Sequence, residues 1–315
     1  MEKLDHWVIV IDKEEGIENY LRYVSRLSQL LAPKKVDVLY NIEPDYVSEE
    51  ILKDIPDLHS AEYVEVEQLL QDLINLHFVS NSEIEFVVKR GKSLVEIISH
   101  SKSTDANLVT MMSRKDDETT QLIHKVSRKA PCHVLIVPEN QALDLHSILV
   151  PVDYSEHSDR AYALASNITN SLDEVTMHAY HAYHDASKYV NQVFETAYEV
   201  NDYYQKKPAI DNTLEKHAKH KLAKYASENS SVSDLATHTD AVEKGQNVGE
   251  NIKNWIEVNR PDLVVLGSKG QSNALLSLSG MVSEYVYTHA KQLQPILIVK
   301  KQGENSNLIK ALLGI

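Results

Sequence analysis

Short continuous apolar runs that alternate with amphipathic segments constrain this chain more than any other feature of its sequence. Apolar runs without polar alternation are typical of strands buried on both faces, as in a parallel sheet covered by helices. Repeated strand–helix units of this kind join parallel strands by right-handed crossovers. The predicted strands are Trp7–Ile11, Val36–Ile42, Ile84–Val88, Leu108–Met112, His133–Val137, Ile148–Val152, Val175–Tyr180, Leu235–Val242, Leu263–Leu266 and Ile296–Val299.

Amphipathic helices are predicted between these strands. The first follows the first strand, shows apolar residues at helical spacing and ends before Pro33. Its counterpart in the second half begins at Ser155, a preferred N-cap residue, with Glu156 and Asp159 in the first turn.

The two halves of the chain repeat each other in the same order, which predicts a duplicated domain. The domains are predicted over residues 1–140 and 144–302, with a polar tail over 303–315. The matching segments are Val8–Asp12 with Leu149–Asp153, Asp105–Val109 with Pro261–Val265, and Ala130–Val137 with Leu293–Val299.

Composition excludes several classes of function. The chain has 315 residues, which suits two domains, and its 32 basic and 46 acidic residues give a formal charge of -14. Such a charge repels nucleic-acid phosphates and anionic lipid, so we expect neither nucleic-acid nor membrane binding. The single cysteine fits a reducing compartment. With no signal peptide and no apolar span of about 20 residues, we expect a cytoplasmic protein.

Glycines mark the strongest candidate site. Gly267 and Gly270 follow the strand Leu263–Leu266, and Gly280 comes nine residues further on, where a helical segment starts. Gly267 lets the chain turn sharply, Gly270 lets the backbone approach a ligand, and free N–H groups near Gly280 hold phosphate. Ligands of doubly wound sheets bind beyond the carboxyl ends of strands. With a strand order of 3-2-1-4-5, Asp153 faces the same crevice.

This pattern, G-x2-G-x9-G after a fourth strand with Asp after the first, resembles the universal stress protein family. Ile148–His157 resembles the opening strand and helix cap of that family, and Ala130–Pro138 resembles its closing strand. The likeness runs twice along nearly the whole chain and is similar to the tandem, two-domain type. It implies an α/β fold of two Rossmann-like domains, each a five-stranded parallel sheet of order 3-2-1-4-5 flanked by helices. It also implies an intramolecular pseudo-dimer packed through the fifth strands.

The resemblance implies an ATP or related adenine-nucleotide site in the second domain. Its ATP-binding members place Ser or Thr where this chain has Met281, so one hydroxyl donor to phosphate is lost. A hydrogen bond to a charged group contributes about 1.5–3 kcal/mol, so the loss lowers affinity about tenfold or more. Ser279 and Ser283 are the neighbouring hydroxyls that could compensate. By position, the site residues are Pro151, Val152, Asp153, Ala179, Leu266, Gly267, Gly270, Gly280, Met281 and Val282.

The first domain departs further from the pattern. The segment Ser113–Thr120, which follows the fourth strand, has no glycine and carries three acidic residues. Side chains crowd the phosphate position there, and the carboxylates repel phosphate. Asp12 alone indicates a turn residue at a strand end, so we expect no nucleotide in this domain.

Histidine pairs give a weaker signal for metal binding. His178 and His181 are three residues apart on a strand, where they point to opposite faces and cannot converge on one ion. His217 and His220 share a helical face, but neighbouring lysines disfavour a cation and favour a solvated helix face. We expect no metal site.

Other residues have two interpretations each. Cys132 indicates a buried structural thiol rather than a nucleophile, because no electropositive partner is evident. The tyrosine-rich segment Tyr183–Tyr204 predicts the apolar side of a helix with a lid loop, or a surface for a ligand or partner. Lys269 either contacts a phosphate or is a mobile surface side chain. The terminal Leu308–Leu312 predicts a short docked helix or a frayed end.

Together these features predict a non-catalytic stress-response or signalling protein whose second domain binds ATP or another adenine nucleotide. The sequence has no Walker loop, nucleophile elbow, paired catalytic carboxylates or zinc signature. Two alternatives stay open, a ligand-free interaction scaffold and a weak nucleotide hydrolase. The protein partner is unknown, and monomer and homodimer are both open.

Overall fold

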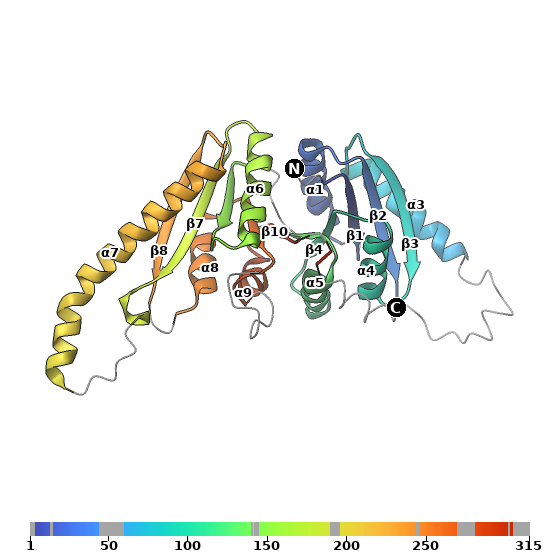
Figure 1. Cartoon of the computed structure of the whole chain (residues 1–315). Helices are drawn as coiled ribbons and strands as arrows, with labels where there is room; N and C mark the ends of the chain where they lie inside the picture. The colour runs from blue at the N-terminus through green and yellow to red at the C-terminus, as the bar shows by residue number, and fades with distance from the viewer. Residues whose placement is uncertain are drawn as a thin grey trace. The chain divides into compact units, whose positions relative to one another are not determined.

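The structure of the protein is a computed structural model (Figure 1). It describes residues 4–12, 15–43, 60–139, 141, 145–189, 196–243, 246–269, 281–301 and 303–304. The chain divides into two compact units, one of residues 1–144 with 294–315 and one of residues 145–293. In these described ranges, no helix combines the length and the apolar character needed to cross a membrane.

The first unit is built on a parallel sheet. Its strands are β1 (His6–Ile11), β2 (Lys35–Ile42), β3 (Glu83–Arg90), β4 (Leu108–Ser113) and β5 (His133–Pro138). They lie in the order β3-β2-β1-β4-β5, and each neighbouring pair is parallel. Every residue of β4 and β5 is buried, as continuous apolar runs predict. The expected order 3-2-1-4-5 is confirmed.

One further strand completes this sheet. β10 (Ile296–Val299) is the fifth strand of the second sequence repeat, yet it groups with the first unit. It pairs antiparallel with β5, with Leu297 opposite Leu135, and all of its residues are buried. The predicted strand therefore forms, and it covers the edge that β5 would otherwise leave open.

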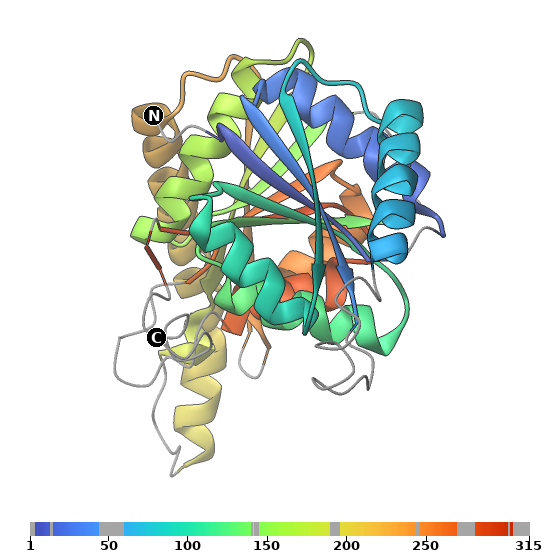
Figure 2. The ribbon, with the colours of Figure 1, turned by 90° about the vertical axis from the view of Figure 1, so that its right-hand side faces the viewer.

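Helices cover both faces of the first sheet. α1 (Ile17–Leu31) packs with α3 (Ser60–His77), and α4 (Ser93–Ser103) packs with α5 (Asp117–Lys129). Figure 2 shows α1, in blue, and α3, in cyan, on one side of the strands with α4 on the other. Right-handed crossovers produce this arrangement, because the chain first moves outward from β1 to β3 and then returns to β4. α1 buries its predicted apolar face and ends at Ala32.

The second unit repeats the pattern. Its strands are β6 (Ser147–Pro151), β7 (Thr176–His184), β8 (Leu235–Val242) and β9 (Leu263–Gly267). They lie in the order β8-β7-β6-β9 and pair in parallel. β7 runs beyond its predicted end at Tyr180, because it stays paired with β8 as far as His184.

The helices of the second unit are α6 (Glu156–Asn170), α7 (Ala197–Asn229), α8 (Val248–Asn259) and α9 (Met281–Ala290). The predicted N-cap of α6 is confirmed, because the Ser158 N–H donates to Ser155 Oγ at 3.2 Å. α7 has 33 residues, a length of about 50 Å. Its buried side chains, including Ala218 and Leu222, lie in its C-terminal half, and its N-terminal half runs beyond the end of β8 (Figure 1).

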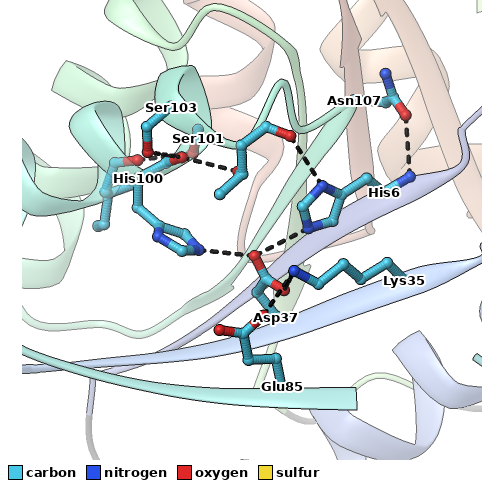
Figure 3. Close-up of polar contacts among 10 residues, drawn as sticks. His6, Lys35, Asp37, Glu85, His100, Ser101, Ser103 and Asn107 are labelled. Carbon is cyan, nitrogen blue, oxygen red and sulfur yellow. Dashed lines mark hydrogen bonds and ion pairs between the residues drawn. The ribbon is translucent and has the colours of Figure 1, made fainter. Parts of the chain in front are cut away.

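A fully buried carboxylate ties the first unit together (Figure 3). Asp37 Oδ2 lies 2.9 Å from His6 Nε2 and 2.8 Å from His100 Nε2, while Lys35 Nζ lies 3.3 Å from Asp37 Oδ1. Lys35 also pairs with Glu85 on β3. Burial alone raises the pKa of Asp37, but the hydrogen bond from His100 and the nearby His6 and Lys35 outweigh it and hold that pKa below its usual value. The cluster therefore links β1, β2, β3 and α4.

We predict that Asp37→Asn lowers the free energy of unfolding by about 2 kcal/mol at neutral pH, because three cationic or dipolar partners lose their carboxylate. The native pKa of Asp37 lies below its unfolded value of about 3.9, so the wild-type contribution is present above that pH. It is lost as the pH falls through the native pKa. Urea unfolding over a pH series should therefore show the two proteins converging in acid.

The matched control is Glu85→Gln, which removes a carboxylate whose side chain is 55% exposed. We expect it to change the free energy of unfolding by less than about 0.5 kcal/mol. Equal losses in the two variants would show that burial of Asp37 is not what makes the cluster stabilising.

Candidate functional site

The second unit has a cavity at the carboxyl ends of its strands. Its volume is about 190 Å³. The pairing of Ile148 on β6 with Leu263 on β9 brings these strand ends together, as the expected strand order requires. The lining residues are Pro151, Val152, Asp153, Ser158, Tyr180, Ala182, Val248, Ile252, Leu266, Gly267, Lys269, Val282 and Ser283.

Most of the sequence-predicted site residues that the structure describes meet at this cavity. Ala179 does not line it. Strand alternation explains the difference, because Tyr180 and Ala182 on β7 face the cavity, and Ala179, the residue directly before Tyr180, points to the opposite face of the sheet. Gly270 and Gly280 lie outside the described residues, and Met281 is described only as the first residue of α9. The residues brought together are Pro151, Val152, Asp153, Leu266, Gly267 and Val282.

Asp153 is held at the turn between β6 and α6. Its Oδ1 accepts a hydrogen bond from the Ser155 N–H at 3.0 Å. Asp153 also lines the cavity, beside the first turn of α6. This contact fixes the start of α6 and keeps a negative charge at the positive end of the helix dipole.

Comparison with protein families matches residues 145–300 to the universal stress protein family. Residues 145–300 belong to that family. Among solved structures, a universal stress protein from Archaeoglobus fulgidus DSM 4304 is similar at 15% identity and a TM-score of 0.59, covering 95% of this chain and 97% of that one. A functionally unknown protein from Pseudomonas aeruginosa PAO1 is similar at 14% identity and a TM-score of 0.65, covering 99% and 98%. No curated protein matches the chain.

Both structural likenesses extend over nearly the whole chain, so they include the first unit as well as the universal stress protein domain. At these identities they establish the fold. The chain is a tandem of two universal-stress-type folds, the arrangement that the internal repeat predicts.

Gly267 is required in this universal stress protein domain by close packing. A Cβ atom added to it would lie 2.8 Å from the backbone carbonyl carbon and oxygen of His157 in α6. Its backbone has no left-handed φ, so the turn that the sequence suggests is not the reason for glycine here. The first turn of α6 therefore approaches the end of β9 more closely than any side chain allows.

The Ser283 hydroxyl does not replace the missing donor. Ser283 Oγ donates to the Gly267 carbonyl at 2.5 Å, and a serine hydroxyl has one proton to donate. The hydroxyl therefore fastens α9 to the end of β9. Ser279, the other hydroxyl considered from the sequence, lies outside the described residues.

The equivalent crevice of the first unit is acidic. A cavity of about 110 Å³ lies beyond β1 and β2, and its lining includes Asp12, Glu43 and Glu118. Thr119 Oγ1 donates to Asp12 Oδ2 at 3.2 Å, and Arg114 Nε lies 3.8 Å from Asp12 Oδ1. Asp12 is thus bound to the loop and helix that follow β4. This chemistry agrees with the expectation that no nucleotide binds here, which stays a prediction.

His178 and His181 contact different partners, as the strand alternation predicts. His178 Nδ1 lies 2.9 Å from His238 Nε2, whereas His181 Nδ1 donates to the Val152 carbonyl at 2.7 Å. Across the described part of the chain, no group of three or more His, Cys, Asp or Glu side chains is arranged to hold a metal. The predicted buried thiol is confirmed, because Cys132 is buried and its burial raises the pKa to about 12.

The tyrosine-rich segment differs from its leading interpretation. Tyr189 and Tyr198 are 65% and 78% exposed, whereas Tyr203 on α7 is half-buried, so only part of this segment packs as the apolar side of a helix. The lid loop falls on residues 190–195, and the terminal run Leu308–Leu312 also lies outside the described residues. The sequence analysis did not assign Tyr180, Ala182, Val248 and Ile252 to the cavity. The period-two alternation of a strand could have identified Tyr180 and Ala182, because both lie on the same face of β7.

We predict that Gly267→Ala lowers the free energy of unfolding by about 1–3 kcal/mol, because backbone atoms of His157 must move to admit the new methyl group. Gly91→Ala is the matched control. Its Cβ would meet the carboxylate of Glu96, the far end of a flexible side chain, so we expect a loss below about 1 kcal/mol. Chemical unfolding of both variants measures the difference, and a larger loss at Gly91 would contradict the packing argument.

Proposed function

We propose that the second unit binds ATP or another adenine nucleotide, and that the protein acts in a stress response or in signalling without catalysing a reaction. The observation that carries this proposal is the convergence of Asp153, Gly267 and the first turn of α9 on one cavity. The N-terminus of a helix offers free N–H groups and the positive end of its dipole, which favour phosphate. A cytoplasmic location is part of the proposal.

The chemistry of the cavity wall supports a ligand with a flat apolar part and a charged part. Ala182, Val248, Ile252 and Leu266 give one apolar side, which suits a purine ring. Lys269 supplies a positive charge near the end of β9. The loss of a hydroxyl at Met281 weakens contacts to phosphate rather than to the base.

Binding would act through the equilibrium between conformations. A ligand that binds one conformation of the second unit more tightly than another stabilises that conformation increasingly as its concentration rises, and so changes the surface offered to a partner protein. We expect no turnover, because Asp153 is the only carboxylate among the described residues that line the cavity, and it accepts the Ser155 N–H. The absence of phosphate release from ATP by the purified protein checks this.

We predict that the full chain binds ATP, ADP or AMP, and that Asp153→Ala weakens binding about tenfold or more through loss of one charged hydrogen-bonding group. Asp12→Ala is the matched control, since it removes the corresponding aspartate of the first unit. It should leave the affinity unchanged. Isothermal titration calorimetry measures both, with circular dichroism to check that each variant is folded.

Two results would contradict the proposal. One is no binding by the folded wild type at millimolar nucleotide, which favours the ligand-free scaffold. The other is an equal loss in Asp12→Ala and Asp153→Ala, which places the ligand elsewhere. Mass spectrometry of molecules released from freshly purified protein identifies the ligand that the cavity carries from the cell.

A further inference from the structure

The residue that follows Asp153 has an unusual backbone conformation. Tyr154 has a φ of 63°, in the left-handed region that non-glycine residues rarely adopt. Among the other non-glycine residues of the described chain with positive φ, Ala32, Asp105 and Arg260 lie within two residues of the C-terminal end of a helix, where left-handed caps are common, and Glu174 lies in the loop between α6 and β7. Tyr154 instead precedes the N-cap of α6, so helix capping does not explain its conformation.

Side chains from β7 and α7 enclose the ring of Tyr154. The ring centroid lies 4.7 Å from that of His181 and 5.4 Å from that of Tyr225, and Lys221 Nζ lies 3.8 Å from it. A lysine ammonium at this distance from an aromatic face is attracted by the ring electrons. We call His181, Lys221 and Tyr225 the Tyr154 cage.

Two residues of the Tyr154 cage form hydrogen bonds to neighbouring parts of the second unit. His181 Nδ1 donates to the carbonyl of Val152, and the Tyr225 hydroxyl donates to Asp159 of α6 at 2.7 Å. Burial raises the pKa of Tyr154 to about 12, and burial lowers the pKa of His181, so both rings are neutral near pH 7. No described residue accepts or donates a hydrogen bond at the Tyr154 hydroxyl, so its ring and not its hydroxyl makes the contacts.

We propose that Tyr154 is a positioning residue for the nucleotide site, and that its cage couples α7 to that site. Asp153 lines the cavity while the next side chain is clamped by α7, so the clamped ring holds the left-handed turn that directs the carboxylate. Reciprocally, a ligand that fixes Asp153 stiffens the cage and α7. This inference rests on the proposed nucleotide binding.

The test uses three variants of the full chain with ATP as the probe. Tyr154→Gly removes the ring, and glycine adopts a positive φ without strain. The variant therefore removes the contacts with the Tyr154 cage while the left-handed turn stays sterically allowed. We expect it to weaken ATP binding about tenfold, the loss of one well-placed polar contact. Tyr154→Phe keeps the ring and should bind as the wild type does. Lys221→Met keeps the aliphatic stem and should weaken binding about threefold, through loss of the cation over the ring.

Hydrogen exchange separates positioning from a structural role. In the wild type, ATP should slow exchange in the C-terminal half of α7, and Tyr154→Gly should lose that response while its circular dichroism stays native. ATP affinity of Tyr154→Gly within twofold of the wild type overturns the proposal, as does an ATP response of α7 that persists in this variant.

A second readout needs no nucleotide. The Ser155 N–H donates both to Asp153 Oδ1 and to Ser158 Oγ of the α6 cap, so its exchange in the free protein reports how firmly the turn that carries the carboxylate is held. Tyr154→Gly should speed this exchange about tenfold, and Tyr154→Phe should not. If the wild type binds no ATP, the proposed function fails, and the Ser155 amide still decides whether Tyr154 positions Asp153. Unchanged exchange there overturns the positioning role.

Discussion

Parallel pairing between β6 and β9 is the constraint on which the candidate site depends. Because the carboxyl ends of parallel strands meet at one edge, the turn after β6 and the end of β9 must share a crevice. The close approach of Gly267 to His157 then sets how far apart α6 and β9 lie. These contacts, together with the hydrogen bond from Ser283 to Gly267, fix the positions of the elements that line the cavity.

The duplicated folds have diverged in their interiors as well as at their crevices. Asp37 and His178 are each the third residue of the second strand of their repeat. Asp37 contacts two histidines and Lys35, whereas His178 lies 2.9 Å from His238 and packs with it against Trp255. Burial lowers the pKa of both histidines, which keeps that cluster neutral. The same strand position therefore holds a buried carboxylate with its polar partners in one repeat and a half-buried aromatic cluster in the other.

Apolar patterning sufficed to predict the strands and their order, because burial on both faces leaves a continuous signal in the chain. Contacts between distant segments left no such signal. The sequence predicts that Gly267 is a turn residue, but in the structure glycine is required there because His157 packs against it. The sequence also offers Ser283 as a donor to phosphate, but its hydroxyl donates to the Gly267 carbonyl. Ala179 was assigned by position in a family pattern, and strand alternation puts the next residue, Tyr180, at the cavity instead. The burial of Asp37 depends on partners from β1 and α4 that no local pattern reveals.

The place of β10 has a consequence for how the chain is made. The buried, largely apolar β5 stays an open edge until residues 296–299 are made. During synthesis the N-terminal sheet must wait for most of the polypeptide to leave the ribosome before its last hydrogen bonds form. An unprotected edge of this kind pairs readily with other chains. Nascent copies are therefore exposed to aggregation during the interval in which the second repeat is still being translated.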